Sequence, residues 1–515
     1  MRFFAAGQPV IRAERNGRYG LAKDAMGILD SLRFHCGTMA TIAFCLLLKR
    51  FQSIHLSYHQ ERLEPTSREL TGVFKRLIGL ALAATTLTIT AQQPVNRKPM
   101  VVVISLDAFG AEALQDPRLP APTLRSMMQH GLYARSMQPI NPTVTWPNHT
   151  AMVTGVDASH HYVLANGQIT NQRSTMSPAI RPWVPRTELV NGTTVYDLAH
   201  EAGLTTAQVD WVAIFKAKTI DWEFPEEPSI SGPIETELAK KGIVARGEIA
   251  TFHQGSQAWR DRIYTQAAAQ IIRDHHPNLM LLHLLALDSI EHAHGYPDPA
   301  ATNTIAFLDD RVKEIVDAVR EAGDLDRTTF LIVSDHGQQS VHHLIHPRAM
   351  LHNDIAVPNN TQTLAGVDIL PEGGLAYVYI HGDATPARLD QLRRYFGLKE
   401  GIAEILDSTE FARIGFPTPK ETNQAPDMVL FAKDDYEFSG GDTGPDTSET
   451  ATVGAHGYSN KLPLMQAIFI ASGANVDPIG PIPPMPNVNV AATISQLLGL
   501  PSMQNIQGTP VKLKR

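Results

Sequence analysis

The sequence predicts an α/β fold, in which a central, mostly parallel sheet is flanked by helices on both faces. Three apolar runs support this prediction, at residues 100–106, 279–287 and 329–334. Unbroken runs rich in Val, Ile and Leu are typical of strands that are buried on both faces. Helical patterns at 256–273 and 301–322 precede the second and third runs. Strands that alternate with helices indicate a sheet that is covered on both sides.

Residues 362–439 follow a different pattern. They predict a strand at 376–380, a helix at 385–396, a second helix around 401–407 and a strand at 428–432. Strands and helices that do not alternate regularly are typical of α+β structure. We therefore expect a smaller α+β insertion within one large domain that spans residues 100–515.

The chain then returns to the main sheet. Residues 466–471 are apolar and predict a further strand, and residues 488–498 predict a closing helix. Between them, residues 478–486 are rich in proline, which favours a rigid loop. Every predicted element after residue 100 thus has a place in a two-sided sheet or in its insertion.

Composition narrows the possible functions. The 515 residues are 43% hydrophobic and 19% charged, which is typical of a folded globular protein. A net charge of -8 gives no basic surface for a nucleic-acid polymer, so an anionic small molecule would have to be held locally, by metals. Both cysteines, Cys36 and Cys45, precede residue 50. The remainder of the chain therefore has neither a disulfide nor a cysteine nucleophile.

The first hundred residues differ from the rest. Residues 73–91 have a basic start, an apolar centre and a small residue before Gln92, which is the form of a secretory signal peptide, and residues 92–99 read as a polar linker. Residues 1–72 show no coherent period, and we expect that translation begins near Val73. The apolar run 39–48 is too short to span a bilayer. We expect an exported protein, periplasmic or secreted, with no stable membrane anchor.

Acidic and imidazole side chains follow the predicted strands. Asp107 ends the first strand, where a lone Asp is most often a turn or cap residue. Asp288 and His292 come after the second strand, and their i, i+4 spacing puts both on one helical face, which suits two ligands of one ion. Nearby Glu291 and His294 are better explained as neighbours of the site or as surface residues.

Asp335 and His336 follow the third strand directly. Both can serve one site only if the backbone is already turning, which Gly337 permits. His456 lies between Gly454 and Gly457, which would let the backbone approach an ion closely. Carboxylates and imidazoles gathered at the strand ends of an open α/β sheet suit two adjacent divalent metal ions.

Thr145 supplies a possible nucleophile. It begins a predicted helix, where a hydroxyl usually serves only as a cap. The alternative is that a divalent ion lowers the pKa of the hydroxyl, so that no base side chain is needed. A helix N-terminus beneath it would favour a phosphoryl group.

In combination these motifs resemble the nucleotide pyrophosphatase/phosphodiesterase family of the alkaline phosphatase superfamily. The resemblance runs from about Lys98 to Leu500, and implies an alkaline-phosphatase-like catalytic domain. The matching motifs are Ser-Leu-Asp107, Pro-Thr-Val-Thr145-Trp-Pro-Asn148-His, Asp288-Ser-Ile-Glu-His292, Ser-Asp335-His336-Gly and Ala-His456-Gly-Tyr.

The resemblance assigns a role to each of these residues. It implies one Zn²⁺ on Asp107, Thr145, Asp335 and His336, and a second Zn²⁺ on Asp288, His292 and His456. Thr145 would form a phosphothreonine intermediate, Asn148 would donate to a phosphate oxygen, and Trp146 would stack a nucleobase. The expected reaction is hydrolysis of a nucleotide diester or anhydride that releases a nucleoside monophosphate.

Other activities of the superfamily compare less well. A sulfatase would need a Cys or Ser in a Cys/Ser-x-Pro-x-Arg context, and a phosphoglycerate mutase would need a Ser nucleophile and a cytoplasmic chain. A phosphonoacetate-type C–P hydrolase uses the same two metals and a Thr, so it remains the alternative. A catalytically silent binding protein is disfavoured because all seven predicted metal ligands are chemically intact. The partner is thus a small nucleotide or another phosphodiester, and no protein partner can be inferred.

The group beyond the phosphate is left open by the sequence. The loops 155–185 and 208–229 carry aromatic residues that line either a pocket or the core: Tyr162, Trp183, Trp211, Phe215, Trp222 and Phe224.

Overall fold

The computed structural model describes residues 97–357 and 360–515. The expected signal peptide at 73–91, the stretch 1–72 and most of the expected linker lie outside these residues. Among the helices that the structure describes, none combines the length and the apolar character that a membrane crossing requires.

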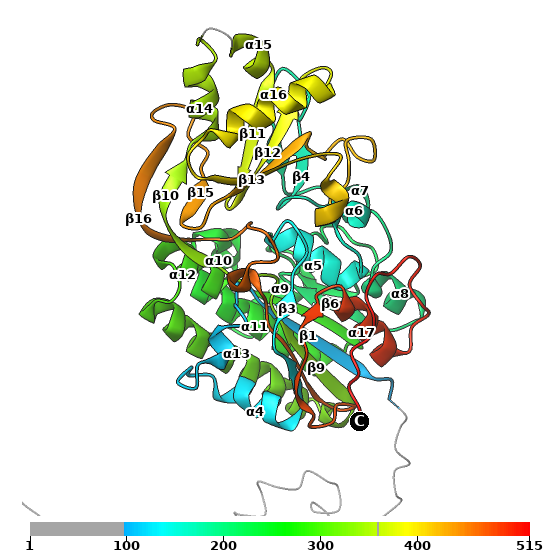
Figure 1. Cartoon of the computed structure of the whole chain (residues 1–515). Helices are drawn as coiled ribbons and strands as arrows, with labels where there is room; N and C mark the ends of the chain where they lie inside the picture. Colours follow the sequence, from blue (N-terminus) through cyan, green and yellow to red (C-terminus); the bar gives the residue numbers. More distant parts are fainter. Residues whose placement is uncertain (1–96, 358–359) are drawn as a thin grey trace, which may run out of the picture. The chain divides into compact units, whose positions relative to one another are not determined.

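A sheet that includes β1, β6 and β9 lies between helices in the described chain (Figure 1). It has eight strands, in the order β18-β2-β17-β9-β1-β8-β6-β7. The strand β1 (Met100–Leu106) lies between β8 (Leu279–Leu284) and β9 (Thr328–Val333), and it is parallel to both. All three strands are buried along their whole length, as their continuous apolar runs predict. Their carboxyl ends therefore meet at one edge of the sheet.

The outer strands complete a mostly parallel sheet. Of the seven neighbouring pairs, five are parallel, and the two pairs made by β17 are antiparallel. The predicted mostly parallel sheet is thus confirmed. The remaining strands are β6 (Thr206–Val209), β7 (Trp222–Phe224), β17 (Phe469–Gly473), β2 (Leu132–Ala134) and β18 (Gly480–Ile482).

Helices cover both faces of the sheet because side chains alternate along β1. Val102 and Ile104 pack in one core cluster, which α11 (Gln257–His275) and α13 (Pro299–Glu321) complete. Val101 and Val103 face the opposite cluster, which includes residues of α8 (Val195–Glu201) and α17 (Asn489–Leu498). Full burial of each such Val, Leu or Ile contributes roughly 1.5–3 kcal/mol. The helices expected at 256–273, 301–322 and 488–498 are therefore confirmed, with small differences at their ends.

A second sheet has the antiparallel order β11-β12-β14-β13. The expected strands at 376–380 and 428–432 correspond to β12 (Leu375–Ile380) and β14 (Met428–Ala432), and the expected helix at 385–396 to α16 (Pro386–Gly397). The other two strands are β11 (Val367–Glu372) and β13 (Ile402–Asp407).

The helix expected around 401–407 is wrong, because this segment is the strand β13. Ile402 and Leu406 are four residues apart, which is also the spacing of one helical face. In the structure a register irregularity between Ile402 and Glu404 changes the side to which the strand points. Ile402 and Leu406 consequently belong to two different core clusters.

A third sheet, with the order β15-β10-β16, brings distant motifs together. The strand β10 (Gln339–Ile345) begins three residues after His336, and β16 (Thr447–Ala455) ends one residue before His456. These two strands are antiparallel, with Gln339 opposite Ala455. The pairing therefore places His456 beside His336, although the sequence did not indicate either strand. The third member is β15 (Tyr436–Phe438).

The proline-rich segment 478–486 is more regular than the expected loop. It contains β18, which pairs in parallel with β2 at the edge of the central sheet, and the two-residue strand β19 (Met485–Pro486). Proline is tolerated in these positions because an edge strand leaves one row of backbone groups unpaired.

Candidate metal centre and active site

Three neighbouring strands deliver acidic side chains to one edge of the central sheet. Asp107 follows β1, Asp335 follows β9, and Asp288 lies in the helix α12 (Ala286–His294), which starts directly after β8. The buried carboxylate of Asp261, on α11, accepts the backbone N–H groups of Leu285 at 3.2 Å and Ala286 at 2.8 Å. This carboxylate caps the start of α12 and so fixes the place of Asp288.

Asp107, Asp335 and His336 form a fully buried group. Nε2 of His336 lies 3.6 Å from Oδ1 of Asp107 and 3.2 Å from Oδ2 of Asp335. Oδ1 of Asp335 accepts the N–H groups of Ala108 and His336, at 3.2 and 3.0 Å. The other oxygen of Asp335 and Oδ1 of Asp107 have no hydrogen-bond partner within the described residues.

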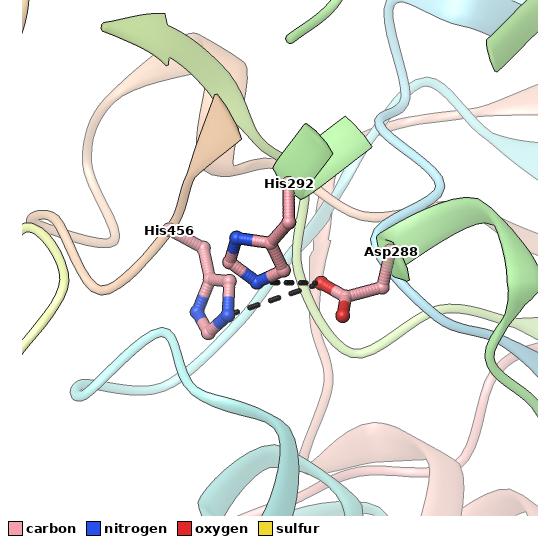
Figure 2. Close-up of side chains that lie close together, drawn as sticks. All are labelled: Asp288, His292 and His456. Carbon is pink, nitrogen blue, oxygen red and sulfur yellow. Dashed lines mark ion pairs between the residues drawn. The ribbon is translucent and has the colours of Figure 1, made fainter. Parts of the chain in front are cut away.

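Asp288, His292 and His456 form a second, more open group (Figure 2). Oδ1 of Asp288 lies 3.3 Å from Nε2 of His292 and 3.9 Å from Nε2 of His456. Figure 2 shows both rings turned toward this one carboxylate. The side chain of His292 is 44% exposed, so this group can be reached from solvent.

Asp288 connects the two groups. Its carboxylate also lies close enough to Asp107 and His336 for the three to hold one ion. The rings of His336 and His456 are stacked, with centroids 4.0 Å apart. All six predicted Asp and His ligands thus lie in one continuous cluster, with Asp288 at its middle.

The three histidines of this cluster present the same nitrogen to its centre. Nδ1–H of His336 donates to the carbonyl of Gly337 at 3.2 Å, that of His292 to Gly454 at 2.9 Å, and that of His456 to Thr143 at 3.0 Å. Backbone carbonyls thereby fix each ring in the tautomer whose Nε2 carries a free lone pair. Such preset imidazoles are typical of metal ligands.

The electrostatics of the cluster fit bound cations. Burial, together with repulsion from Asp335 and Asp288, raises the pKa of Asp107 well above its usual value. Burial lowers the pKa of His336 to about 4 and that of His456 to about 3, so both rings are neutral at pH 7. Asp107 and Asp335 each have a buried oxygen without a hydrogen-bond partner, and within the described residues their ion-pair contacts are with His and not with Arg or Lys. Such buried carboxylates are costly unless a cation neutralises them. The residues therefore fit divalent metal ions.

Thr145 lies at the edge of the buried group. It is the first residue of the helix α5 (Thr145–Thr154), whose cap position is occupied by Val144. The Thr145 hydroxyl is therefore not a helix cap, and Oγ1 instead lies 3.5 Å from Nε2 of His336. His149, one turn later, donates from Nδ1 to the carbonyl of Thr145 at 2.9 Å, which anchors the first turn.

The glycines around His456 serve a purpose other than the expected one. A side chain at Gly454 would overlap the backbone of Glu291, and one at Gly457 would overlap the backbone of Glu372. Gly457 also has a φ of 94°, which an L side chain rarely adopts. The glycines thus let the His456 loop pack against neighbouring backbone. In this way they fix the position of His456, whereas the expectation was that they would let the backbone approach an ion closely.

The phosphate-binding role expected for Asn148 is contradicted by its hydrogen bonds. Its Nδ2 donates to the carbonyls of Pro142 and Val144, both at 2.9 Å. Its Oδ1 accepts from the N–H of Ile140 at 2.8 Å and from the side chain of Asn487 at 2.9 Å. Because both amide hydrogens are used and the side chain is buried, Asn148 holds the loop before α5 together and has no donor for a substrate.

Asn166 is a polar residue that the sequence analysis missed. Its Oδ1 accepts the backbone N–H of Trp146 at 3.0 Å, which places its amide beside the first turn of α5. Nδ2 of Asn166 makes no hydrogen bond within the described chain. The available signal was the pair Asn166-Gly167, which by itself indicates only a turn.

His283 is a second residue that was missed. It lies inside the otherwise apolar strand β8, opposite Ser105, and is fully buried. Its Nε2 lies 2.9 Å from Oδ2 of Asp107, and its Nδ1 lies 3.1 Å from the carbonyl of Asp210. The signal in the sequence was a histidine inside an otherwise apolar strand. His283 contacts Oδ2 of Asp107, whereas Oδ1 is the oxygen closer to His336.

Trp146 borders a pocket beside Thr145. The expected aromatic residues divide between this pocket and other places: Trp183, Trp211 and Phe215 line the pocket with Trp146. Phe224 packs in the core, and Trp222 stacks on His275 with centroids 3.4 Å apart. Tyr162 lines a different, more polar pocket.

An α/β sheet whose strand ends gather carboxylates and imidazoles beside a buried hydroxyl defines a metal-dependent hydrolase. The model of the Type I phosphodiesterase / nucleotide pyrophosphatase family matches residues 101–459. The chain therefore belongs to this family, and the resemblance seen in the motifs is confirmed.

Named relatives agree with this assignment. The chain is 23% identical to ectonucleotide pyrophosphatase/phosphodiesterase 1 of Saccharomyces cerevisiae over 78% of its length, and spans 56% of that protein. It is 24% identical to ectonucleotide pyrophosphatase/phosphodiesterase family member 7 of Mus musculus, over 82% of this chain and 88% of the mouse protein. The chain thus covers little more than half of the yeast relative.

A solved structure supports the fold. Murine ectonucleotide pyrophosphatase/phosphodiesterase 5, as an inactive variant in complex with AMP, superposes with a TM-score of 0.61 over 80% of this chain and 98% of the murine chain. The sequence identity is 17%, so this likeness concerns the fold. It confirms the expected alkaline-phosphatase-like α/β architecture.

Proposed function

We propose that this protein is an exported two-zinc phosphodiesterase and nucleotide pyrophosphatase that works through a phosphothreonine intermediate. One observation carries the proposal: the hydroxyl of Thr145 starts a helix and lies 3.5 Å from Nε2 of His336, within the cluster of predicted metal ligands. Family membership and the fold are consistent with it.

The donor set divides into two ion positions. Asp107, Asp335, His336 and the hydroxyl of Thr145 would hold one zinc ion. Asp288, His292 and His456 would hold the other, with Asp288 lying close to both. Three imidazoles among the ligands favour zinc over magnesium, which prefers oxygen ligands.

Zinc ions bound here would lower the pKa of the Thr145 hydroxyl and of a water molecule and would neutralise charge on the phosphoryl group. The residues themselves supply the geometry. Thr145 attacks phosphorus in line with the departing oxygen, and the N-terminus of α5 beneath it favours the phosphoryl group. Water then cleaves the phosphothreonine from the open side, where His292 is exposed.

Asn166 takes the role that Asn148 does not have. Its free Nδ2 lies in the amide group that holds the N–H of Trp146, next to Thr145. An amide donor in this place can stabilise the charge that develops on a non-bridging phosphate oxygen. Asn166 would therefore orient the phosphoryl group while Thr145 attacks it.

The substrate is a small nucleotide. The murine relative was solved in complex with AMP, and the pocket beside Thr145 is lined by aromatic rings that can stack a base. The names of the relatives begin with "ecto", which agrees with an exported protein whose residues 73–91 form a signal peptide. We further propose that residues 362–439 form an insertion in a catalytic domain that spans 100–515.

The test is a comparison of substrates. Purified protein with added zinc is expected to hydrolyse p-nitrophenyl thymidine 5′-monophosphate, to lose this activity in a chelator and to regain it when zinc is returned. Phosphonoacetate is expected to remain intact. Turnover of phosphonoacetate alone would replace the proposed activity with C–P hydrolysis.

A further inference from the structure

Gln338 contacts the carboxylate that connects the two groups of predicted metal ligands. It directly precedes β10 and is 3% exposed. Its Nε2 donates to Oδ1 of Asp288 at 3.1 Å. Oδ1 is also the oxygen that lies 3.3 Å from Nε2 of His292 and 3.9 Å from Nε2 of His456. A carboxylate oxygen has two lone pairs, so Oδ1 can accept this N–H and still bind an ion between the two imidazoles.

The contact with Asp288 determines which way the Gln338 amide points. A carboxylate oxygen accepts hydrogen bonds, so the amide turns Nε2 toward Asp288 and Oε1 away from it. Oε1 is buried and accepts no hydrogen bond within the described residues. A buried acceptor without a donor lowers the stability of a protein. The stability of the fold therefore does not explain a glutamine at this position, whereas its contact with Asp288 does.

Neighbouring backbone leaves the Gln338 side chain little room to move. A Cβ atom at Gly454 would lie 2.7 Å from Oε1 of Gln338 and 2.3 Å from the carbonyl oxygen of Glu291. The carbonyl of Gly454 also accepts the Nδ1–H of His292 at 2.9 Å. The amide of Gln338 is thus packed where the end of β16 meets α12, next to the backbone that orients His292.

The position of Gln338 in the chain relates the two ion positions to each other. Gln338 belongs to the same short segment as Asp335 and His336, which are predicted ligands of the buried ion. Its amide, however, holds Asp288, which is a predicted ligand of the more open ion. Hydrogen bonds to a ligating carboxylate orient it, and their loss typically costs roughly 10–100-fold in metal affinity or activity.

We propose that Gln338 is a positioning residue, which holds Asp288 in place and thereby sets the zinc affinity of the open position formed by Asp288, His292 and His456. This inference rests on the proposed function and adds a residue to its site. Without the N–H of Gln338, the carboxylate is free to turn away from the two imidazoles. The open position then lacks its one predicted carboxylate ligand, while Asp107, Asp335 and His336 remain in place.

The experiment replaces Gln338 by Met, which has a similar length and no donor, in the full chain. Competition with a fluorescent zinc chelator gives the two zinc affinities of each protein. We expect the affinity of the open position to fall by about 10–100-fold, and that of the buried position by much less. His456→Ala, which removes a predicted ligand of the open position, identifies the affinity that belongs to it.

Two further measurements separate positioning from a structural role. The metal-free Gln338→Met protein should unfold at no lower temperature than the metal-free unchanged protein, because the substitution also removes the buried Oε1 that has no donor. The zinc concentration that gives half of the maximal diester hydrolysis should rise, and excess zinc should restore most of kcat. A damaged fold would not recover on addition of zinc.

Gln266→Met is the matched control. The half-buried amide of Gln266 also donates to a carboxylate, that of Glu314 at 3.0 Å, and this hydrogen bond joins α11 to α13. Its loss should leave both zinc affinities unchanged. Should Gln338→Met not fold, Gln338→Asn keeps an amide but withdraws it from Asp288 by one methylene group, and the same selective loss of zinc is expected.

The outcomes distinguish this inference from the function beneath it. Unchanged zinc affinities in the Gln338 variant, or an equal loss at both positions, would overturn the positioning role of Gln338 while the diesterase activity stands. Failure of the unchanged protein to bind two zinc ions, or to hydrolyse the diester when zinc is present, would overturn the proposed function itself.

Discussion

Oγ1 of Thr145 lies 3.5 Å from Nε2 of His336, although 191 positions separate the two residues in the chain. His336 donates its Nδ1–H to the carbonyl of Gly337, so the nitrogen that faces Thr145 is the one with a free lone pair. Oγ1 of Thr145 and the lone pair on Nε2 of His336 are thus close enough to contact one bound ion.

Replacement of Thr145 by Ala tests the nucleophile. We expect diester hydrolysis to fall by at least about 10³-fold, because the substitution removes the hydroxyl that is proposed to attack phosphorus. Zinc content should stay largely unchanged, since six Asp and His ligands remain. The measurements are kcat/KM with p-nitrophenyl thymidine 5′-monophosphate and metal analysis of the purified variant.

Thr145→Ser is the matched control, because it retains a hydroxyl and should keep a substantial part of the activity. Turnover by Thr145→Ala close to that of the unchanged protein would disprove the assignment of the nucleophile. A loss of zinc together with activity would instead make Thr145 chiefly a ligand.

His283 should govern how tightly the proposed zinc ion beside Asp107 is held. It contacts the outer oxygen of Asp107 at 2.9 Å and so orients the inner oxygen toward His336. His283→Ala should weaken binding of one zinc equivalent by about 10–100-fold. Competition with a fluorescent zinc chelator gives the two affinities.

His283→Gln provides the comparison, because its amide can reach the position of Nε2 and donate to Asp107. We expect it to recover part of the zinc affinity that His283→Ala loses. Equal zinc affinities in all three proteins would mean that His283 merely fills space in β8.

Substitution of Asn148 should mainly lower stability, whereas substitution of Asn166 should mainly lower catalytic activity. Asn148→Ala leaves buried groups of Ile140, Pro142 and Val144 without partners, and should lower the free energy of unfolding by about 2–4 kcal/mol. Asn166→Ala should change it by less than about 0.5 kcal/mol but reduce kcat/KM about 10²-fold. Urea denaturation and the diester assay measure the two effects. If Asn148→Ala instead reduced kcat/KM strongly and left stability unchanged, while Asn166→Ala lowered stability, phosphate binding would be assigned to Asn148.

The sequence could predict the central sheet because its strands are buried on both faces. A strand such as β8 must then be apolar at nearly every position, and this leaves an unbroken run that few other structures require. The same logic located the strand ends, and therefore Asp107, Asp288 and Asp335. The sequence could not predict β10 and β16, since their residues are partly exposed and carry polar side chains.

Residue roles were harder to predict than residue positions. The motif around Thr145 indicated that Asn148 lies near the nucleophile, and it does lie three residues away on α5. Which way an amide points depends on acceptors that come from elsewhere in the fold, such as Asn487, 339 positions away. For the same reason the role of Asn166, which the folded chain brings beside Trp146, could not be predicted from its Asn-Gly pair, which by itself indicates only a turn.

His161 should make the protein sensitive to acid. It is fully buried, and its Nδ1 accepts the N–H of Val163 at 3.1 Å, so the ring must be neutral. Burial lowers its pKa to about 3, against about 6.5 in the unfolded chain. Between these two values the unfolded chain binds a proton that the folded protein does not. The free energy of unfolding therefore falls as the pH drops through this window.

The contribution of His161 can be isolated from the slope of the free energy of unfolding against pH. His161→Asn keeps an acceptor near the position of Nδ1 but cannot be protonated. Between pH of about 6 and 4, its free energy of unfolding should fall less steeply with pH than that of the unchanged protein, by up to about 1.4 kcal/mol per pH unit. Urea denaturation across this range, at one metal content, compares the two proteins, and identical slopes for both would show that His161 takes up a proton in the folded state.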